Sequence, residues 1–269
     1  MLDNNIQLDG ALLAARYAFM PNKLRYCGGD KNRELFEYVV NNQNDAGLEM
    51  MLKEFETMYP YLKLIAEANQ ILDPFNYRVV EAYWLGNELL ENISLKNFYR
   101  YLIDEQKLKK RFKPKILEKV FGKIPLGAKP HHSWHVFNIP KRTGHYPVEH
   151  SLETMDECRI GWGQITKTQK HPSSTAKLAT GRGKNTKSPI INTIFIDSKP
   201  LILDNNRLKL GEAVEREVWY ESNEKAFIKQ PKMGDWVSIH WGWVCDFLTE
   251  NQVKNLEKWT KYNLALASL

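Results

Sequence analysis

Histidines supply the densest group of candidate metal ligands in this sequence. His131, His132 and His135 fall within a stretch of five residues. A helical stretch would place His131 and His135 on one face, whereas an extended stretch would alternate the side chains. Three imidazole ligands are enough for a metal site with an open position. The alternative is a polar interdomain loop in which Trp134 and Phe137 provide the packing.

The chain contains only three cysteines, Cys27, Cys158 and Cys245. An odd and sparse count argues against a disulfide framework and is typical of a reducing compartment. No two of them form a CxxC pair, which argues against a structural zinc site of the usual spacing. Cys158 is either a thiolate metal ligand or a small residue buried in a strand. Cys245 is predicted to fill core space, and a position near His240 makes it an additional candidate ligand.

Cys27, Asp30, His145 and His150 are further candidate ligands. Cys27 precedes two glycines and Asp30 between two expected helices, and Asp30 is predicted to cap the second helix. A cysteine just before a helix N-terminus has a lowered pKa, which suits a second ligand or a nucleophile. The alternative is a buried cysteine in a helix–helix turn. His145 and His150 could add ligands to the histidine cluster.

The elements that must position these residues differ between the two halves of the chain. Residues 1–121 are predicted to form a helical domain, because apolar residues recur at i, i+3, i+4 and i+7. Pro60 can begin a helix but cannot lie inside one, so it divides a long helical segment. Ser94 is expected to cap a later helix. The expected helices cover residues 8–20, 32–40, 46–58, 61–72, 78–93, 95–112 and a short segment between 114 and 122.

Residues 122–151 read as a connector between the halves. They contain four prolines, three glycines and five histidines. Such a composition interrupts regular structure, and we expect only one short strand, at residues 134–139.

Residues 152–269 are predicted to form a small β-barrel followed by a helix. Short segments with a period of two are separated by turn residues, which indicates several strands in a compact barrel or sandwich. The expected strands cover residues 158–167, 191–197, 199–204, 207–211, 213–221, 225–230 and 235–244. Thr249 and Gln252 have the spacing of a capping box at the start of the final helix. The fold class is therefore α+β.

Charge and hydropathy limit the range of partners. The net charge is +6 and the pI is about 9.0, with basic residues concentrated in residues 107–123 and 167–187. The second cluster lacks the aromatic residues of a nucleic-acid groove and reads as an inserted loop, so nucleic-acid binding is not expected. No apolar stretch is long enough to cross a bilayer, and no signal peptide is visible. We expect a soluble cytoplasmic protein.

The C-terminal half resembles a family of known chaperones. The segment Gly234-Asp235-Trp236-Val237 leads to Ile239-His240-Trp241-Gly242, and an acidic stretch and a final helix follow. This order resembles the HypC-type chaperones of nickel–iron hydrogenase assembly, in which a Gly-Asp-aromatic-Val strand leads to a Val-His-x-Gly turn. The family's essential N-terminal cysteine strand corresponds to the segment that begins at Cys158.

The resemblance implies an OB-like barrel and a role in hydrogenase maturation. It implies that Cys158 and His240 hold iron carrying cyanide and carbonyl ligands, since thiolate and imidazole suit ferrous iron. The implied partners are the hydrogenase large-subunit precursor or other assembly proteins. Over its full length the chain also resembles an uncharacterised prokaryotic family that is loosely associated with hydrogenase gene clusters.

Three functional hypotheses follow. The first is a hydrogenase maturation factor that binds an iron–ligand group or an assembly partner through Cys158 and His240. The second is a metal-dependent enzyme at the interface of the two halves, which uses His131, His132 and His135 with Cys27 or a carboxylate. The third is a structural adaptor that keeps the barrel without its metal chemistry.

Overall fold

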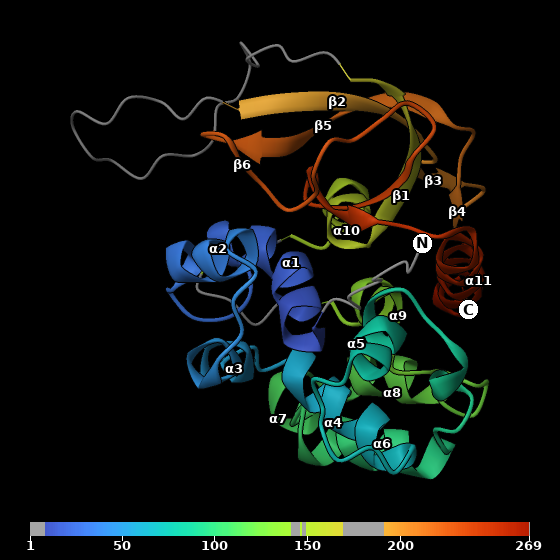
Figure 1. The fold of residues 1–269 in the computed structure, drawn as a ribbon. Coiled ribbons are helices and arrows are strands. Elements are labelled where there is room, and N and C mark those ends of the chain that lie inside the picture. The colour runs from blue at the N-terminus through green and yellow to red at the C-terminus, as the bar shows by residue number, and fades with distance from the viewer. Residues whose placement is uncertain (1–8, 141–145, 147–148, 169–190, 269) are drawn as a thin grey trace.

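A computed structural model describes residues 9–140, 146, 149–168 and 191–268 of this chain. The α+β class is confirmed: α1 to α9 gather at one end of the molecule, and the strands lie at the other with α10 and α11 beside them (Figure 1). The predicted inserted loop lies outside the described residues from position 169 onward, and so does His145. No helix of the described part is long and apolar enough to cross a membrane.

The helices coincide broadly with the predicted amphipathic segments, and several of them are shorter than the segments predicted. Ser94 caps α6 as predicted, and Pro60 lies in the first turn of α4. The expected helix at 78–93 is interrupted after Trp84, and the one at 95–112 is divided at Lys107, which adopts a left-handed conformation. The helices before the first strand are α1 Gly10–Lys23, α2 Asn32–Val40, α3 Ala46–Lys53, α4 Met58–Ala68, α5 Tyr77–Trp84, the 3₁₀ turn η1 Glu88–Leu90, α6 Leu95–Asp104, α7 Leu108–Arg111, α8 Pro114–Gly122, α9 His132–Asn138 and α10 Leu152–Cys158.

Three local predictions were wrong. Residues 134–139 lie mostly in helix α9, because His131 caps that helix by accepting a hydrogen bond from the amide of Ser133. Cys158 does not begin a strand but ends α10, whose start is fixed by a capping box that the strand prediction overlooked. Asp30 is not the N-cap of α2, since Lys31 takes that position.

The strands form one curved sheet and a separate hairpin. The strands of the sheet are β1 Gly161–Lys167, β2 Ile191–Ser198, β5 Val214–Ser222, β6 Lys225–Ala226, β7 Trp236–His240 and β8 Trp243–Phe247, and β3 Leu201–Asp204 pairs with β4 Arg207–Leu210. The expected strand at 235–244 is therefore two strands, because Trp241 and Gly242 turn the chain with positive φ angles of 52° and 72°. The final helix α11, Glu250–Ala267, begins with the predicted capping box.

The predicted barrel is incompletely closed. The strand order is β2-β1-β7-β8-β5-β6, and β2 also pairs with β5 along its whole length. Between β5 and β8, however, the only paired residues are Trp219 and Trp243. One edge of the structure therefore lacks a continuous hydrogen-bonded ladder, and the strands form a strongly curved sheet.

The main hydrophobic core joins the helices to the sheet. It runs from Leu13 of α1 and Trp84 of α5 to Trp243 of β8 and Trp259 of α11, all of which are buried. Burial of such large side chains contributes most of the stability of a fold, at roughly 25 cal/mol per Å² of apolar surface. The two halves consequently share one core where they meet.

Helix α1 is the element that connects the halves most directly. The Tyr17 hydroxyl lies 2.9 Å from the Ser238 hydroxyl on β7, and Arg16 forms an ion pair of 2.5 Å with Asp246 on β8. Burial raises the pKa of Asp246, and the Arg16 guanidinium opposes that rise. Paired in this way, the carboxylate can stay in a largely buried position without the full cost of desolvation.

A glycine substitution tests how tightly α11 packs on the helical half. Gly86 has a φ of +86°, and an added Cβ would lie 2.0 Å from Cδ1 of Trp259. We expect Gly86→Ala to lower the free energy of unfolding by about 2 kcal/mol or more, because both backbone strain and a clash oppose it. Gly122→Ala is the matched control, since a Cβ there meets nothing within 4 Å. Urea unfolding of both variants measures the difference, and equal midpoints would contradict this packing.

Candidate metal centre

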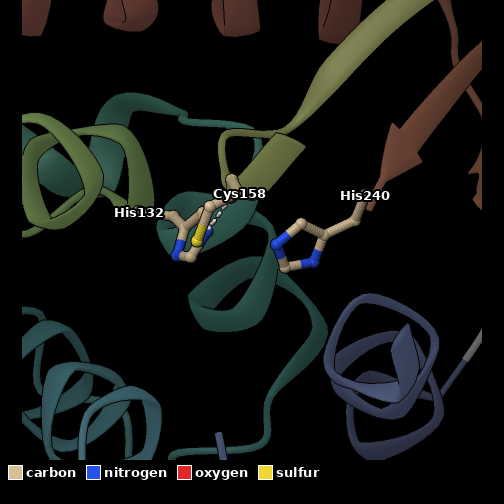
Figure 2. Close-up of side chains that lie close together, drawn as sticks. All are labelled: His132, Cys158 and His240. Atoms are coloured by element: carbon tan, nitrogen blue, oxygen red, sulfur yellow. Dashed lines mark hydrogen bonds between the residues drawn. The ribbon is translucent and has the colours of Figure 1, made fainter. Parts of the chain in front are cut away.

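Three ligand-type side chains from distant parts of the sequence meet between the helices and the sheet. One ligand atom from each of His132, Cys158 and His240 lies within 4.8 Å of the other two (Figure 2). All three residues are buried. Within the described part of the chain this is the one group of three such residues close enough to hold a metal ion.

Secondary structure explains why Cys158 lies beside His240. Strands β1 and β7 are antiparallel, and Gly161 at the start of β1 pairs with Ile239 near the end of β7. The residues just before β1 are therefore neighbours of the residues that end β7. Cys158 and His240 occupy those two positions, and α9 brings His132 in from the helical side.

A second set of contacts fixes α10 relative to the turn after His240. The amide of Trp241 donates to the carbonyl of Glu157 at 2.9 Å. Arg159, which is 1% exposed, donates to Asp156 at 2.8 Å and to the carbonyl of Lys199 at 2.6 Å. A guanidinium this deeply buried is stable only when its donors are paired, so these bonds hold the end of α10 in one place.

The imidazole of His240 is oriented by the backbone of α1. Its Nδ1 lies 2.6 Å from the carbonyl oxygen of Tyr17, which can only accept, so Nδ1 carries the proton. That carbonyl is available because Pro21, four residues later in the helix, has no N–H to donate to it. The neutral ring therefore has its lone pair on Nε2, and Figure 2 shows that nitrogen facing His132 and Cys158.

The imidazole of His132 is held by two hydrogen bonds. Its Nε2 donates to the carbonyl oxygen of Cys158 at 2.7 Å, and its Nδ1 lies 3.1 Å from the hydroxyl of Tyr83. In this tautomer Tyr83 donates to Nδ1, which carries the lone pair. A metal ion bound by His132 would replace either the Tyr83 hydroxyl at Nδ1 or the Cys158 carbonyl at Nε2. A backbone carbonyl that fixes the tautomer of a histidine is the usual outer shell of a metal site.

Burial keeps the His132 imidazole neutral. Desolvation lowers the pKa of His132 well below its ordinary value, and the neighbouring His240 lowers it further. A metal ion binds the unprotonated imidazole, so this environment holds the ring in the form that binds metals.

A small cavity adjoins the three residues. Its volume is about 30 Å³, and Cys27, Trp84 and His135 contribute to its walls together with the three candidate ligands. This is room for about two or three molecules the size of water. The cavity can therefore hold an ion and very small ligands, but not an organic substrate.

The separation of the ligand atoms is close to that of a metal site. Around tetrahedral zinc, nitrogen and sulfur ligands lie about 3.3–3.6 Å apart, given metal–ligand bonds of about 2.0–2.3 Å. Because the ligand atoms of this cluster lie within 4.8 Å of one another, they would need to approach by at most about 1.5 Å to reach that spacing.

The other predicted ligands lie outside this group. The Nδ1 atom of His131 lies 2.7 Å from the hydroxyl of Ser133, and Asp30 is exposed. The thiol of Cys245 donates to the carbonyl of Trp243, and burial raises its pKa well above the ordinary value. His135 lines the cavity without belonging to the group of three.

The residues that position His132, Cys158 and His240 were not predicted from the sequence. Tyr83, the carbonyl of Tyr17 and Pro21 make their contributions through contacts over long sequence separations. A proline near the end of an amphipathic helix is the one signal that was visible in advance, because it frees a carbonyl four residues earlier.

Comparison with known proteins identifies the family of this chain. The profile of a family of unknown function, DUF6390, matches residues 6–181 and 183–269. The chain belongs to this family. The matched residues include all three members of the buried cluster. No curated protein and no solved structure matches the chain significantly.

The buried His131 predicts a specific loss of stability in acid for the metal-free protein. Desolvation lowers the pKa of His131 to about 3 in the folded state, against an ordinary value of 6.5. Below pH 6.5 the unfolded chain therefore binds a proton that the folded chain does not, until the pH approaches 3. The stabilising effect of the neutral ring is complete above pH 6.5 and falls by about 1.4 kcal/mol per pH unit below it.

The measurement is urea unfolding at pH 7, 6, 5 and 4 in the presence of a chelator. His131→Asn is the matched variant, because asparagine keeps a capping acceptor for α9 and does not titrate. We expect the wild type to lose stability more steeply than this variant between pH 6 and 4. Parallel curves would show that His131 is not held neutral by the fold.

Proposed function

We propose that this protein binds a single metal ion through His132, Cys158 and His240. The observation that carries the proposal is the convergence of these side chains in one buried group. Its support comes from the backbone carbonyls that orient both imidazoles and from the low pKa of His132.

The ligand set suits a borderline or soft ion. One thiolate and two imidazoles are typical of zinc, copper and ferrous iron, whereas magnesium and calcium prefer oxygen ligands. Three protein ligands leave one or more positions open, and the adjoining cavity is where a small exogenous ligand would bind. Ferrous iron is the ion we favour, on the basis of the resemblance to the HypC-type chaperones.

The size of the cavity favours carriage of an ion over turnover of an organic substrate. A drug-sized ligand needs a pocket of roughly 300 Å³ or more, ten times the volume beside this cluster. Diatomic ligands such as cyanide and carbon monoxide are within its limits. If the protein is a metal-dependent enzyme, its substrates are therefore very small molecules. Of His131, His132 and His135, only His132 would then bind the metal.

We further propose that the cargo is destined for hydrogenase assembly. This rests on the resemblance of the segments around Gly234 and His240 to the HypC-type chaperones, and on the position of His240 beside Cys158. The HypC-like, OB-like description of the sheet belongs to the same proposal. In this chain Cys158 is 3% exposed and is the last residue of helix α10, so the cargo would be enclosed and not presented at a chain terminus.

Titration with cobalt(II) tests the ligand set. Cobalt replaces zinc or iron in such sites and absorbs visibly when bound to a thiolate, so it serves as the probe. We expect one ion per chain, and an affinity loss of at least about 100-fold, or about 2.7 kcal/mol, for Cys158→Ala and for His240→Asn. The matched controls are Cys245→Ala and His131→Asn, which alter a buried cysteine and a buried histidine outside the cluster.

Two results would contradict the metal proposal. The first is the absence of stoichiometric binding of cobalt, zinc or ferrous iron to the folded wild type. The second is equal loss of binding in the control variants and the cluster variants, because that pattern would report general destabilisation.

Infrared spectroscopy tests the hydrogenase role separately. After anaerobic co-production with hydrogenase assembly proteins, we expect bands from cyanide and carbonyl ligands in the wild type and in Cys245→Ala. The bands should be lost in Cys158→Ala, because the thiolate would be the principal ligand to the iron group. Stoichiometric iron without such bands under these conditions would rule out carriage of the iron–ligand group and leave a plain metal-binding protein.

A further inference from the structure

The candidate metal centre raises the question of how an ion reaches it. His132, Cys158 and His240 are 6%, 3% and 1% exposed, and His135 on the cavity wall is 5% exposed. An ion in solution cannot contact these side chains directly. A first contact must therefore be made by a residue that is both nearer the surface and adjacent to the cavity.

Cys27 is the one ligand-type residue that meets both conditions in the described part of the chain. It lines the same cavity as His132, Cys158 and His240. Unlike them it is only partly buried, and it forms no disulfide. Cys27 is thus the partly exposed residue on the wall of the cavity that the buried cluster also lines.

The backbone around Cys27 is fixed in place. The side-chain amide of Asn22 donates to the carbonyl of Cys27 at 2.9 Å and to that of Gly29 at 2.6 Å. Gly28 has a φ of +75°, and its Cα packs so closely on Phe55 that an added Cβ would lie 2.5 Å from the ring. Phe55 also lines the cavity. These contacts hold the Cys27 loop against the cavity wall.

One residue of the cavity wall, Trp84, carries a buried polar group. Trp84 is 3% exposed, and its indole N–H has no hydrogen-bond partner among the described residues. Buried indole N–H groups usually have a partner. A water or another small molecule beside this N–H would supply one.

We propose that Cys27 is the capture thiol of this protein, which takes up a thiophilic divalent ion at the surface and passes it to Cys158, His132 and His240. The inference rests on the proposed metal-binding function and adds a route to it. On capture, the Cys27 thiol releases its proton to solvent and the thiolate replaces a water on the ion. On transfer, Cys158 loses its proton and Cys27 regains one, so no oxidant or reductant is needed.

Stopped-flow uptake of cobalt(II) by the metal-free full-length chain tests this route. We expect Cys27→Ser to slow uptake by at least about tenfold while the final stoichiometry and affinity stay those of the wild type. Cys245→Ser is the control variant, because it removes a buried thiol that does not line the cavity. Its uptake rate should match that of the wild type.

Two outcomes would overturn the capture role. An unchanged uptake rate in Cys27→Ser would show that the ion enters elsewhere. Loss of stoichiometric binding in that variant, with folding intact by circular dichroism, would make Cys27 a permanent ligand and not a transient one. Failure of the proposed function would look different, since the wild type itself would then bind no cobalt.

Alkylation gives a second measurement that does not depend on a variant. Iodoacetamide should modify Cys27 faster than Cys158 or Cys245 in the metal-free protein, because the other two are buried. The singly modified chain should take up cobalt at least about tenfold more slowly. Uptake at the unmodified rate would contradict the proposal.

Discussion

The hydrogen bond from the His240 imidazole to the backbone carbonyl of Tyr17 is the contact on which the candidate centre depends. It joins the last residue of β7 to the middle of α1, across the boundary between sheet and helices. It also decides which nitrogen of His240 faces Cys158. Without an acceptor on the α1 side, the ring would lose both its orientation and its tautomer.

The rest of the interface supports this contact. Tyr17 also reaches Ser238 through its hydroxyl, and Arg16 pairs with Asp246, so three successive contacts hold α1 against β7 and β8. The shared hydrophobic core excludes water from the same region. Low local polarity strengthens each hydrogen bond, and burial lowers the pKa of His132 and keeps that imidazole neutral. The metal-binding form of the cluster is thus a consequence of how the two halves pack.

Burial of the three candidate ligands would slow the exchange of any ion bound to them. A centre that is sealed within a shared core binds its ion in a defined geometry but exchanges it slowly. The partly exposed Cys27 at the cavity wall offers a path that does not require the halves to separate.

The sequence by itself determined the α+β class, most helical segments and the capping box of α11, and it singled out Cys158 and His240 as candidate ligands. These features depend on local periodicity, on side chains within four residues and on a recognisable motif. Only the tertiary structure decided that His132 and not His131 joins them. The register of α9 turns His131 back to cap its own helix, whereas the pairing of β1 with β7 brings Cys158 beside His240. Such choices depend on contacts between residues distant in the chain, which no local pattern encodes.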